Sequence, residues 1–478
     1  MHVAEQHREL TNAELAMRLA LLIVISAGTA LLLGTAGLDA RQQVATGVFL
    51  AIILGTLFFW TFRLSIAFLG VAVLIASRSL SIPAFVESAS LPVILFLAGM
   101  MVIAGALRDL GFFTWVVQSI LSLPRMTGRK FMVTLALASA LLACAVDEVT
   151  SIILITILVF QVCGRLKLDP VPYVIMCVLC TNVGSAGTML GNPVSIYIGA
   201  KAGLTFQDFI VWAFPIMLVT LGITIMLTVL WFRKELREFD EKLQERLERN
   251  LSLAPKVTVP YKRSLLFLTV TVLFIASHHF LEELFHLERN SILLVAPLVC
   301  AGVIMIVRRD RARHYVENDV DWWELLFFML LFAIAGTLEY TGVTAFMAEH
   351  FQRGFGTDLA FLVPVVMVIT ALGSAFVDNV IFVAAFSPVI VELGTVVQPM
   401  PLWWALLFGA CIGGNITMIG SVANIVALGM LEKQYRTHMS FWRWLKVGVV
   451  VALIAGVVAW ALIMLAAPFM PDALPAGL

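Results

Sequence analysis

Residues 131–163 read FMVTLALASALLACAVDEVTSIILITILVFQVC, and this stretch decides the fold. It consists of two apolar arms of about 14 residues each, joined at Asp147 and Glu148. Because a membrane-spanning helix needs roughly 20 apolar residues, neither arm crosses a bilayer comfortably on its own. The pattern predicts a hairpin that enters the membrane and returns to the same side, with two acids at its tip.

The whole chain has the composition of a membrane protein. Of its 478 residues, 61% are hydrophobic and 13% are charged, and the mean hydropathy is +0.99. Long uncharged runs recur along the chain, which indicates membrane-spanning helices. We predict an all-α polytopic membrane protein with about 11 transmembrane spans. The net charge is zero, and we expect no nucleic-acid partner.

A second stretch repeats the form of the first. Residues 359–393 are two apolar arms joined at Asp378 and Asn379. A charged side chain that faces lipid costs on the order of 3 kcal/mol, so protein or water must solvate Asp378. Capping of the second arms by Asp147 and Asp378 is the simpler interpretation, since Asp often starts a helix. We favour a further role because an uncharged Ser or Thr would cap equally well.

Each hairpin is followed by a helix that Gly, Asn and Thr residues interrupt. The interruptions read CTNVGSAGTMLGNP at 180–193 and CIGGNITMIGSVAN at 411–424. They predict broken helices over residues 172–200 and 402–430. Such glycines also permit close helix packing, but packing does not require the neighbouring amides and hydroxyls. A break leaves backbone N–H and C=O groups unpaired, so it is a natural place for ligand binding.

Hairpins and breaks belong to an internal repeat. Three pairs of segments match in the same order: IAGALRDLG at 103–111 with IAGTLEYTG at 334–342, VDEV at 146–149 with VDNV at 377–380, and TMLG at 188–191 with TMIG at 417–420. The first two pairs are offset by 231 residues and the third by 229. We therefore predict repeat 1 over residues 46–233 and repeat 2 over 264–478. An extra N-terminal helix occupies 1–45, and a cytoplasmic linker, expected to be a solvated or headgroup-level helix, occupies 234–263.

The basic residues predict the orientation of the chain. With the N-terminus in the cytoplasm, 26 of the 31 Lys and Arg residues fall inside. The five outside are Arg41, Arg78, Lys201, Arg289 and Arg353. The positive-inside rule favours this arrangement in the plasma (inner) membrane. The two hairpins then enter from opposite sides, so the repeats are inverted, and the C-terminus is external.

Inverted repeats predict one site near the middle of the membrane, formed by both tips and both breaks. The tips supply the residues expected to couple transport to protons or ions, which are Asp147, Glu148, Asp378 and Asn379. The breaks supply the residues expected to bind substrate, which are Asn182, Ser185, Thr188, Asn192, Asn415, Thr417, Ser421 and Asn424. Neither Lys nor Arg occurs in these four segments, and this disfavours an anionic substrate.

The acids determine the predicted mechanism. Burial favours the protonated form of a carboxyl group, whereas a bound cation favours the charged form. Competition between a proton and a second solute for one acidic site is the minimum that an antiporter needs. We predict a proton-coupled secondary active transporter. The chain has neither an HExxH nor a GxSxG motif, so we do not expect an enzyme, and we expect no cofactor and no bound metal.

Three stretches of the sequence resemble the arsenite permease and Na+/H+ antiporter branch of the ion-transporter superfamily. They are PVPYVIMCVLCTNVGSAGTMLGNP at 170–193, VDNVIFVAAFSP at 377–388 and LWWALLFGACIGGNITMIGSVANIVALG at 402–429. The superfamily also contains citrate, dicarboxylate and silicon-efflux carriers. The resemblance implies two inverted repeats, a mobile transport domain that moves like an elevator beside a scaffold, and a homodimer.

The resemblance also assigns residues. Asp147 and Asp378 match the acids at the hairpin tips of this branch, and Asn415 and Thr417 match its second break. The Ser-Asn-Thr tips that are typical of dicarboxylate carriers are absent, because both tips are acidic.

Three solutes remain open. Arsenite is an uncharged trihydroxide at neutral pH, so amides and hydroxyls can bind it, and efflux of arsenite or antimonite is our first prediction. Exchange of Na+ for H+ fits the acids equally well. Transport of an organic anion such as citrate is the third possibility. Cys144 and Cys411 lie near a tip and a break and could offer sulfur to arsenic, although Cys more often serves as a small buried apolar residue.

Overall fold

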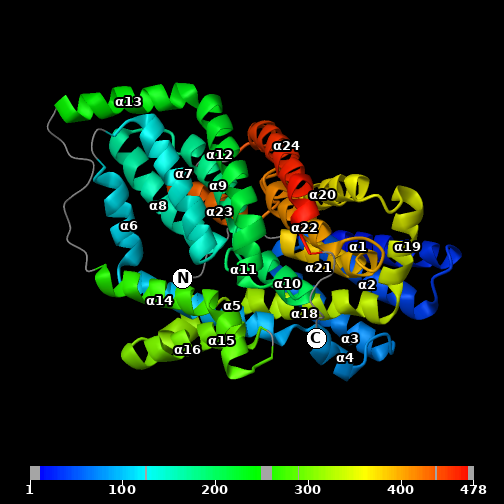
Figure 1. The fold of residues 1–478 in the computed structure, drawn as a ribbon. Helices are drawn as coiled ribbons and strands as arrows, with labels where there is room; N and C mark the ends of the chain where they lie inside the picture. The colour runs from blue at the N-terminus through cyan, green and yellow to red at the C-terminus, as the bar shows by residue number, and fades with distance from the viewer. Residues whose placement is uncertain (1–10, 124–125, 249–260, 289, 437–438, 472–478) are drawn as a thin grey trace.

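The computed structural model describes residues 11–123, 126–248, 261–288, 290–436 and 439–471, except the side chain of Leu247. All regular secondary structure in these ranges is helical (Figure 1). Nine of the described helices are long and apolar enough to cross a membrane, or ten if one bent pair counts as a single span. The chain is an all-α polytopic membrane protein, and the number of 11 spans stays a prediction.

The first part of the chain forms α1 (Asn12–Thr35), α2 (Ala40–Phe58), η1 (Trp60–Phe62), α3 (Arg63–Ala76), α4 (Ile82–Ser88), α5 (Leu91–Asp109) and α6 (Phe112–Leu121). The predicted hairpin and break that follow form α7 (Gly128–Ala145), α8 (Glu148–Leu166), α9 (Val171–Ser185) and α10 (Pro193–Ala202). Next come α11 (Phe206–Asp208), η2 (Phe209–Ala213), α12 (Phe214–Trp231) and α13 (Arg233–Glu248).

The second part begins with α14 (Lys262–Ala276), α15 (His278–Phe285), α16 (Ser291–Val307), α17 (Ala312–His314), η3 (Tyr315–Asp319), α18 (Trp322–Tyr340) and α19 (Val343–Phe355). The other predicted hairpin and break form α20 (Leu359–Phe376), α21 (Asn379–Leu393), α22 (Pro399–Gly413) and α23 (Val422–Tyr435). The described chain ends with α24 (Phe441–Ala466) and η4 (Ala467–Phe469).

Each predicted hairpin consists of two helices that are separated by two residues. The arms α7 and α8 contain 18 and 19 residues, and α20 and α21 contain 18 and 15. They are longer than the predicted 14 residues because the helices continue past the apolar runs; Thr127, for example, caps α7 before its apolar run starts. Three of these arms are long enough to span a bilayer, so re-entry into the membrane stays a prediction.

The two helix breaks span residues 186–192 and 414–421. In the first, Asn192 caps α10 by accepting a hydrogen bond from the Ser195 N–H at 2.7 Å. A Cβ atom at Gly191 would overlap the carbonyl oxygen of Ser185, so only glycine allows the backbone to fold back on itself here. The second break ends in the same way, with Ser421 as the cap of α23.

Equivalent helix contacts occur in the two halves. The arm α7 packs on α9, and α20 packs on α22. A Cβ on Gly184 would lie 2.5 Å from the Cα of Ala140, and a Cβ on Gly413 would lie 2.5 Å from the Cα of Ala371. These glycines and alanines are related by the offsets of the sequence repeat. The repeat boundaries and the inverted orientation of the halves stay predictions.

The second half of each broken helix packs against the other hairpin. Helix α10 contacts α21 and α22, whereas α23 contacts α8 and α9 (Figure 1). Helix α18 contacts α2, α3 and α4 as well as α21. This arrangement interleaves the two predicted repeats, and it brings α3 and α18 close to the second tip.

The helix of the predicted linker, α13, is solvated on one face only. One face of α13 is buried against α7 and α8, with Leu236, Phe239 and Leu243 in the contact. The Phe239 ring stacks on Phe131 at 5.0 Å, and Asp240 accepts a hydrogen bond from the Gly128 N–H at 2.6 Å. Apolar residues recur every three to four positions among the charges, so one face of the helix is buried and the other carries the charges. Residues 249–260 of the linker lie outside the described residues.

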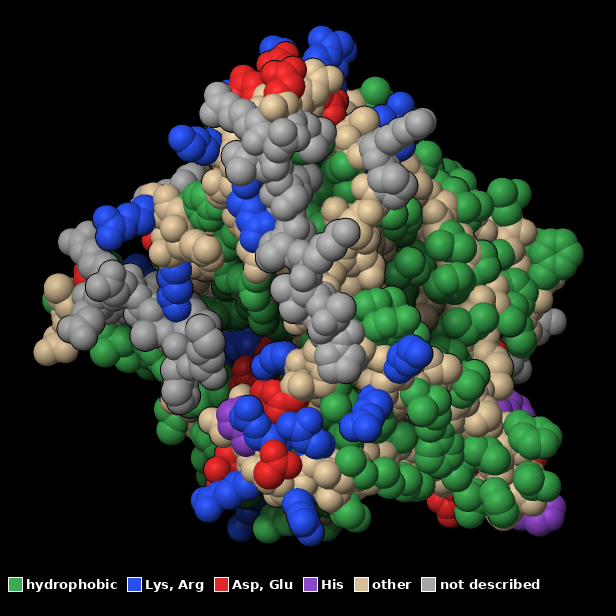
Figure 2. Space-filling view, turned by 90° about the vertical axis from the view of Figure 1, so that its left-hand side faces the viewer, with side chains coloured by type: hydrophobic (Ala, Val, Ile, Leu, Met, Phe, Trp, Pro, Cys, Tyr) green, Lys and Arg blue, Asp and Glu red, His purple; other side chains and the backbone are tan. Residues whose placement is uncertain are grey.

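Basic side chains are numerous on the face of the molecule that Figure 2 shows. Figure 2 shows the face on which α6, α8 and α13 lie in Figure 1, with many Lys and Arg side chains over much of it and hydrophobic side chains to one side. This distribution is typical of a cytoplasmic face. The orientation stays a prediction, and both chain termini lie outside the described residues.

Candidate functional site

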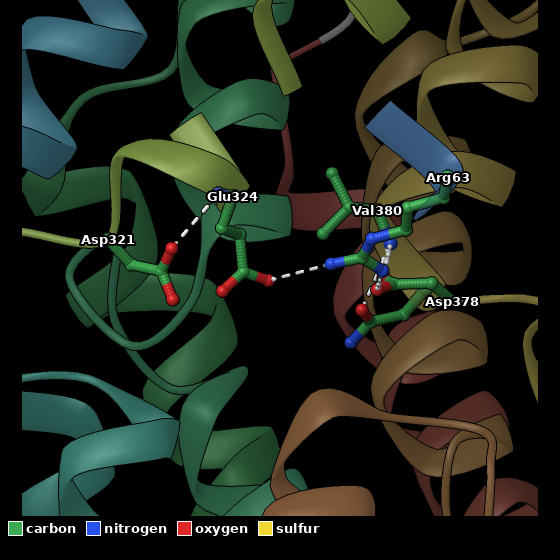
Figure 3. Close-up of polar contacts among 6 residues, drawn as sticks. Arg63, Asp321, Glu324, Asp378 and Val380 are labelled. Atoms are coloured by element: carbon green, nitrogen blue, oxygen red, sulfur yellow. Dashed lines mark hydrogen bonds and ion pairs between the residues drawn. The ribbon is translucent and has the colours of Figure 1, made fainter. Parts of the chain in front are cut away.

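The second hairpin tip is an ion-paired site. Asp378 is 2% exposed and caps α21 by accepting a hydrogen bond from the Val380 N–H at 3.0 Å. Its other carboxylate oxygen accepts from Nη1 of Arg63 at 3.4 Å (Figure 3). Asn379 follows in the chain and is also buried. One carboxylate oxygen of Asp378 therefore caps the helix, and the other forms the ion pair.

Arg63 is a buried cation that the sequence did not reveal. It begins α3, is 5% exposed, and lies 3.9 Å from the centre of the Trp60 ring and 4.5 Å from that of Phe327. Its Nη2 donates to Oε1 of Glu324 at 3.5 Å. By sequence, Arg63 falls among the 26 basic residues placed on the cytoplasmic side. An arginine between two apolar runs and beside aromatic residues was the available signal.

Glu324 is the second residue of this site that was not predicted. It lies in the first turn of α18, where its backbone N–H donates to Asp321 at 3.1 Å, and its side chain is 14% exposed. The N-terminus of a helix stabilises a nearby negative charge. Figure 3 shows Arg63 between Glu324 on one side and Asp378 on the other. One guanidinium thus joins α3, α18 and the second tip.

The described residues place no such cation at the first hairpin tip. Asp147 is partly buried and caps α8, accepting a hydrogen bond from the Thr150 N–H at 2.7 Å. Arg108 interacts with it electrostatically. The Arg108 side chain, however, is 52% exposed and pairs with Asp319 at 3.0 Å. In the described part of the chain, Asp147 is thus held by the helix start and not by an ion pair.

Glu148 is the most unusual group of the site. It is 2% exposed, and its Oε2 atom has no hydrogen-bond partner among the described residues. The nearby Ser185 hydroxyl donates to the Asn182 carbonyl at 3.0 Å, and it also interacts with the Glu148 carboxyl group. Glu148 also interacts electrostatically with the carboxyl groups of Asp147 and Asp378, and with that of Glu324. A carboxylate in this place requires a proton or a cation.

The side chains of the two breaks bind each other. The Asn182 amide donates to the side-chain oxygens of Asn415 at 2.8 Å and Asn424 at 2.9 Å. The Ser421 hydroxyl donates to the Asn182 side-chain oxygen at 3.0 Å. All four residues are buried. Residues predicted from different halves of the chain therefore form one hydrogen-bonded network.

The network leaves little capacity for a solute. The Asn424 amide donates to the carbonyls of Gly414 and Thr417, each at 2.8 Å, and the Asn415 amide donates to the Leu179 carbonyl at 3.1 Å. Because their donors are used by the protein, these amides join the two breaks in this structure. A solute would have to replace some of these hydrogen bonds.

Two of the remaining predicted binding residues, Thr188 and Thr417, join breaks to hairpins. The hydroxyl of Thr188 donates to the Cys144 carbonyl, and that of Thr417 donates to the Ala375 carbonyl. These two contacts are related by the sequence repeat. They hold each break against the first arm of its own hairpin.

Both candidate sulfur atoms are buried. Asn192 donates to the Ser185 hydroxyl at 2.8 Å and to the Cys411 sulfur at 3.2 Å, and the Cys144 thiol donates to the Gly184 carbonyl at 2.9 Å. All six cysteines are buried and free. Within the described ranges, no cluster of three His, Cys, Asp or Glu residues could hold a metal ion.

Comparisons with known proteins support a transporter. An uncharacterised transporter of Mycobacterium tuberculosis is 30% identical over 367 residues, which cover 76% of this chain and 83% of that protein. An uncharacterised transporter of Synechocystis is 25% identical over 413 residues, covering 82% of this chain and 90% of that protein. The mouse P protein is 26% identical over 515 residues, covering 90% of this chain and 61% of that protein.

A solved structure and a family profile complete the comparison. The YdaH transporter of Alcanivorax borkumensis has a similar fold, with a TM-score of 0.52 and 18% identity, and the match covers 82% of this chain and 88% of that chain. Residues 48–409, well over half of the chain, match the family described as "Citrate transporter". The chain is therefore a member of the citrate transporter family of membrane transporters.

Proposed function

We propose that this transporter exchanges protons for a small solute and that Glu148 carries the exchanged proton. The observation that supports this best is the buried Glu148 carboxyl group, which has an oxygen without a partner among the described residues. An ionisable group inside a membrane protein commonly marks an ion or proton pathway. An uncompensated buried charge is costly, so Glu148 is stable when it binds a proton and ionises when a cation replaces it.

The other predicted coupling residues are less suited to exchange. Asp147 and Asp378 accept hydrogen bonds from helix starts, and Asp378 also binds Arg63. Hydrogen bonds and opposite charge both stabilise the ionised form of a carboxyl group. Asn379 has no titratable group. We therefore assign proton exchange to Glu148 and structural support to the two aspartates.

For the solute, we propose arsenite, antimonite or a similar metalloid hydroxide. One guanidinium, that of Arg63, pairs with Glu324 and Asp378, while Glu148 and Asp147 add two further carboxyl groups that interact with these acids. An anion would meet an excess of negative charge here, whereas an uncharged hydroxide would not. The uncharged hydroxide would bind by replacing some of the hydrogen bonds between the amide side chains of the two breaks.

An organic anion is the second candidate. The family description names citrate. An anionic substrate was disfavoured because the tips and breaks contain no Lys or Arg, but Arg63 places a positive charge beside the second tip. A carboxylate substrate would bind here only if it displaced Glu324 or Asp378 from the guanidinium. Exchange of Na+ for H+ at Glu148 is the third candidate, and it needs no separate solute pocket.

One assay separates these candidates. Everted membrane vesicles that contain the protein are energised by respiration, and the pH gradient is followed while arsenite, antimonite, Na+, Li+ and citrate are added in turn. We expect the metalloids to dissipate the gradient. Dissipation by Na+ or Li+ alone, or by citrate alone, would contradict the metalloid proposal and identify the alternative.

The same assay tests the assignment of Glu148. Glu148→Gln keeps the size of the side chain and removes its exchangeable proton, so we expect the solute-induced dissipation to fall to the level of vesicles without the protein. Glu349→Gln is the matched control, because Glu349 is exposed and, among the residues that the structure describes, pairs with the neighbouring Arg353 on α19. If Glu148→Gln exchanges protons like the control, another group carries the proton.

Orientation and assembly are also proposals. We propose a plasma-membrane homodimer with a cytoplasmic N-terminus and an elevator-like movement of hairpins and breaks. Because all six native cysteines are buried, single cysteines introduced at Arg353 and Lys234 can report on the two faces. A membrane-impermeant maleimide applied to intact cells should label the first position and leave the second unlabelled. Labelling of the second position and not the first would mean that the chain has the opposite orientation in the membrane.

A further inference from the structure

The two tips differ in two features that affect charge, one residue of the tip and one residue beside it. The sequence repeat aligns Asp147 with Asp378 and Glu148 with Asn379, so the second tip has an amide where the first has an acid. The second tip also has the Arg63 guanidinium at 3.4 Å from Asp378. We propose that Arg63 is a fixed counter-cation for the second tip, and that exchangeable protons or alkali cations bind only at the first.

Arg63 is held firmly in its place. Its guanidinium lies over the rings of Trp60 and Phe327 and binds carboxylates on α18 and at the second tip. A planar guanidinium suits such a site because it stacks on aromatic rings and donates several hydrogen bonds at once. At 5% exposure it is sheltered from water and soluble ions. The second tip therefore keeps a positive charge without binding one from solution.

Asp378 and its surroundings contain a defined set of charges. Arg63 reaches Asp378 from α3, and Glu324 reaches the same guanidinium from α18. Glu148 interacts with Asp378 electrostatically from the start of α8. Glu324 in turn interacts with Asp321 and Asp147. Arg63 is the one cation in this set, so among the charged groups of the described chain that interact with Asp378, its removal leaves only acids.

The first tip has the opposite arrangement. The Oε2 atom of Glu148 has no hydrogen-bond partner among the described residues, and Arg108 is largely engaged by Asp319 at the surface. The charge of this tip must be met from solution, by a proton or a small cation. This inference rests on the proposed ion coupling, and it adds that each transport cycle uses one exchangeable site and not two.

Infrared spectroscopy of the full-length protein in lipid tests the proposal without transport. Protonated carboxyl groups give a separate C=O stretching band. We expect the wild type to show such a band at neutral pH. Glu148→Gln should remove this band, whereas Asp378→Asn should leave it unchanged. Loss of the band in Asp378→Asn would overturn the proposal, because it would show that the second tip carries a proton.

Removal of Arg63 gives the complementary result. We expect Arg63→Gln to gain an additional protonated carboxyl band. The double variants that combine Arg63→Gln with Asp378→Asn or with Glu324→Gln should show less of this additional band. Arg63→Lys keeps the charge and should match the wild type, as should Arg108→Gln. An unchanged spectrum in Arg63→Gln would overturn the proposal. If Arg63→Gln does not fold, the single variants Glu148→Gln and Asp378→Asn still show which tip carries the proton.

The result can be separated from the proposed function. If the vesicle assay shows no proton exchange but the infrared bands follow the expected pattern, the proposed function fails and the assignment of Arg63 stands. If protons are exchanged but Asp378→Asn removes a protonated band, the proposed function stands and the second tip also binds a proton.

Discussion

The two hairpin tips share a sequence motif but have different electrostatic surroundings. Residues 146–149 read VDEV and residues 377–380 read VDNV, and in both tips the aspartate accepts a hydrogen bond from the start of the next helix. The second aspartate is also paired with Arg63. The first is followed by Glu148, which is buried with an unpartnered oxygen in the described structure.

This comparison shows which properties a local motif determines. The motif sets the backbone of the tip and the helix cap, because both depend on neighbours in sequence. The charge around the tip is set by α3 and α18, which lie far away in the sequence and have no counterpart in the motif. Two tips with the same local structure can therefore have different roles.

Moving the acid from the first tip to the second should have the largest effect on proton exchange. The double variant Glu148→Asn and Asn379→Glu moves one carboxyl group to the repeat-related position. We expect proton exchange in the everted vesicles to be lost, because at the second tip Arg63 stabilises the ionised form of the new acid. If the double variant exchanges protons at the wild-type level, the tips are equivalent and the comparison fails.

Neutralisation of each aspartate should affect stability unequally. Asp378→Asn weakens the contact with a buried guanidinium, and hydrogen bonds to charged groups contribute about 1.5–3 kcal/mol. Asp147→Asn keeps an N-cap of equal quality, so we expect a change within about 0.5 kcal/mol. Thermal unfolding of the purified variants in detergent measures the difference. Equal shifts in Tm would show that Arg63 contributes nothing to the second tip.

Much of the fold could be predicted from the sequence. The tips and breaks are local features, because a pair of polar residues in an apolar run and a cluster of Gly, Asn and Thr each interrupt a helix at their own position. The helix ends at Ser185 and Gly413 reflect this. The burial of α13 was missed because its charges outweigh three apolar residues that meet the hairpin only in the folded chain.

The site was less predictable because its contacts join distant segments. Arg63 and Asp378 are 315 residues apart in the chain, and Arg63 and Glu324 are 261 apart. The sequence located the amides of the breaks, but it did not show that Asn182 and Asn415 bind each other. Such pairings depend on how the two halves interleave, and no local pattern encodes that.

Substitution of two glycines should have equal effects in the two halves. A Cβ on Gly184 or on Gly413 would lie 2.5 Å from a facing Cα, and overpacking of this kind costs about 1–3 kcal/mol. We expect Gly184→Ala and Gly413→Ala to lower Tm similarly. Gly222→Ala in α12 is the control, because nothing lies within 4 Å of its Cβ position. Unequal losses would mean that the packing around the tips differs as well as the charge.

The smallest effect is expected from an exposed ion pair that also reaches α18. Lys201 at the end of α10 pairs with Glu339 at 2.6 Å, and both side chains are partly exposed. Exposed pairs contribute about 0–1 kcal/mol because water and salt screen them. We therefore expect Lys201→Gln to change Tm by much less than Asp378→Asn. A comparable loss would mean that an exposed ion pair to α18 stabilises the protein as much as the buried one, and that burial of Arg63 gives its ion pair no special importance.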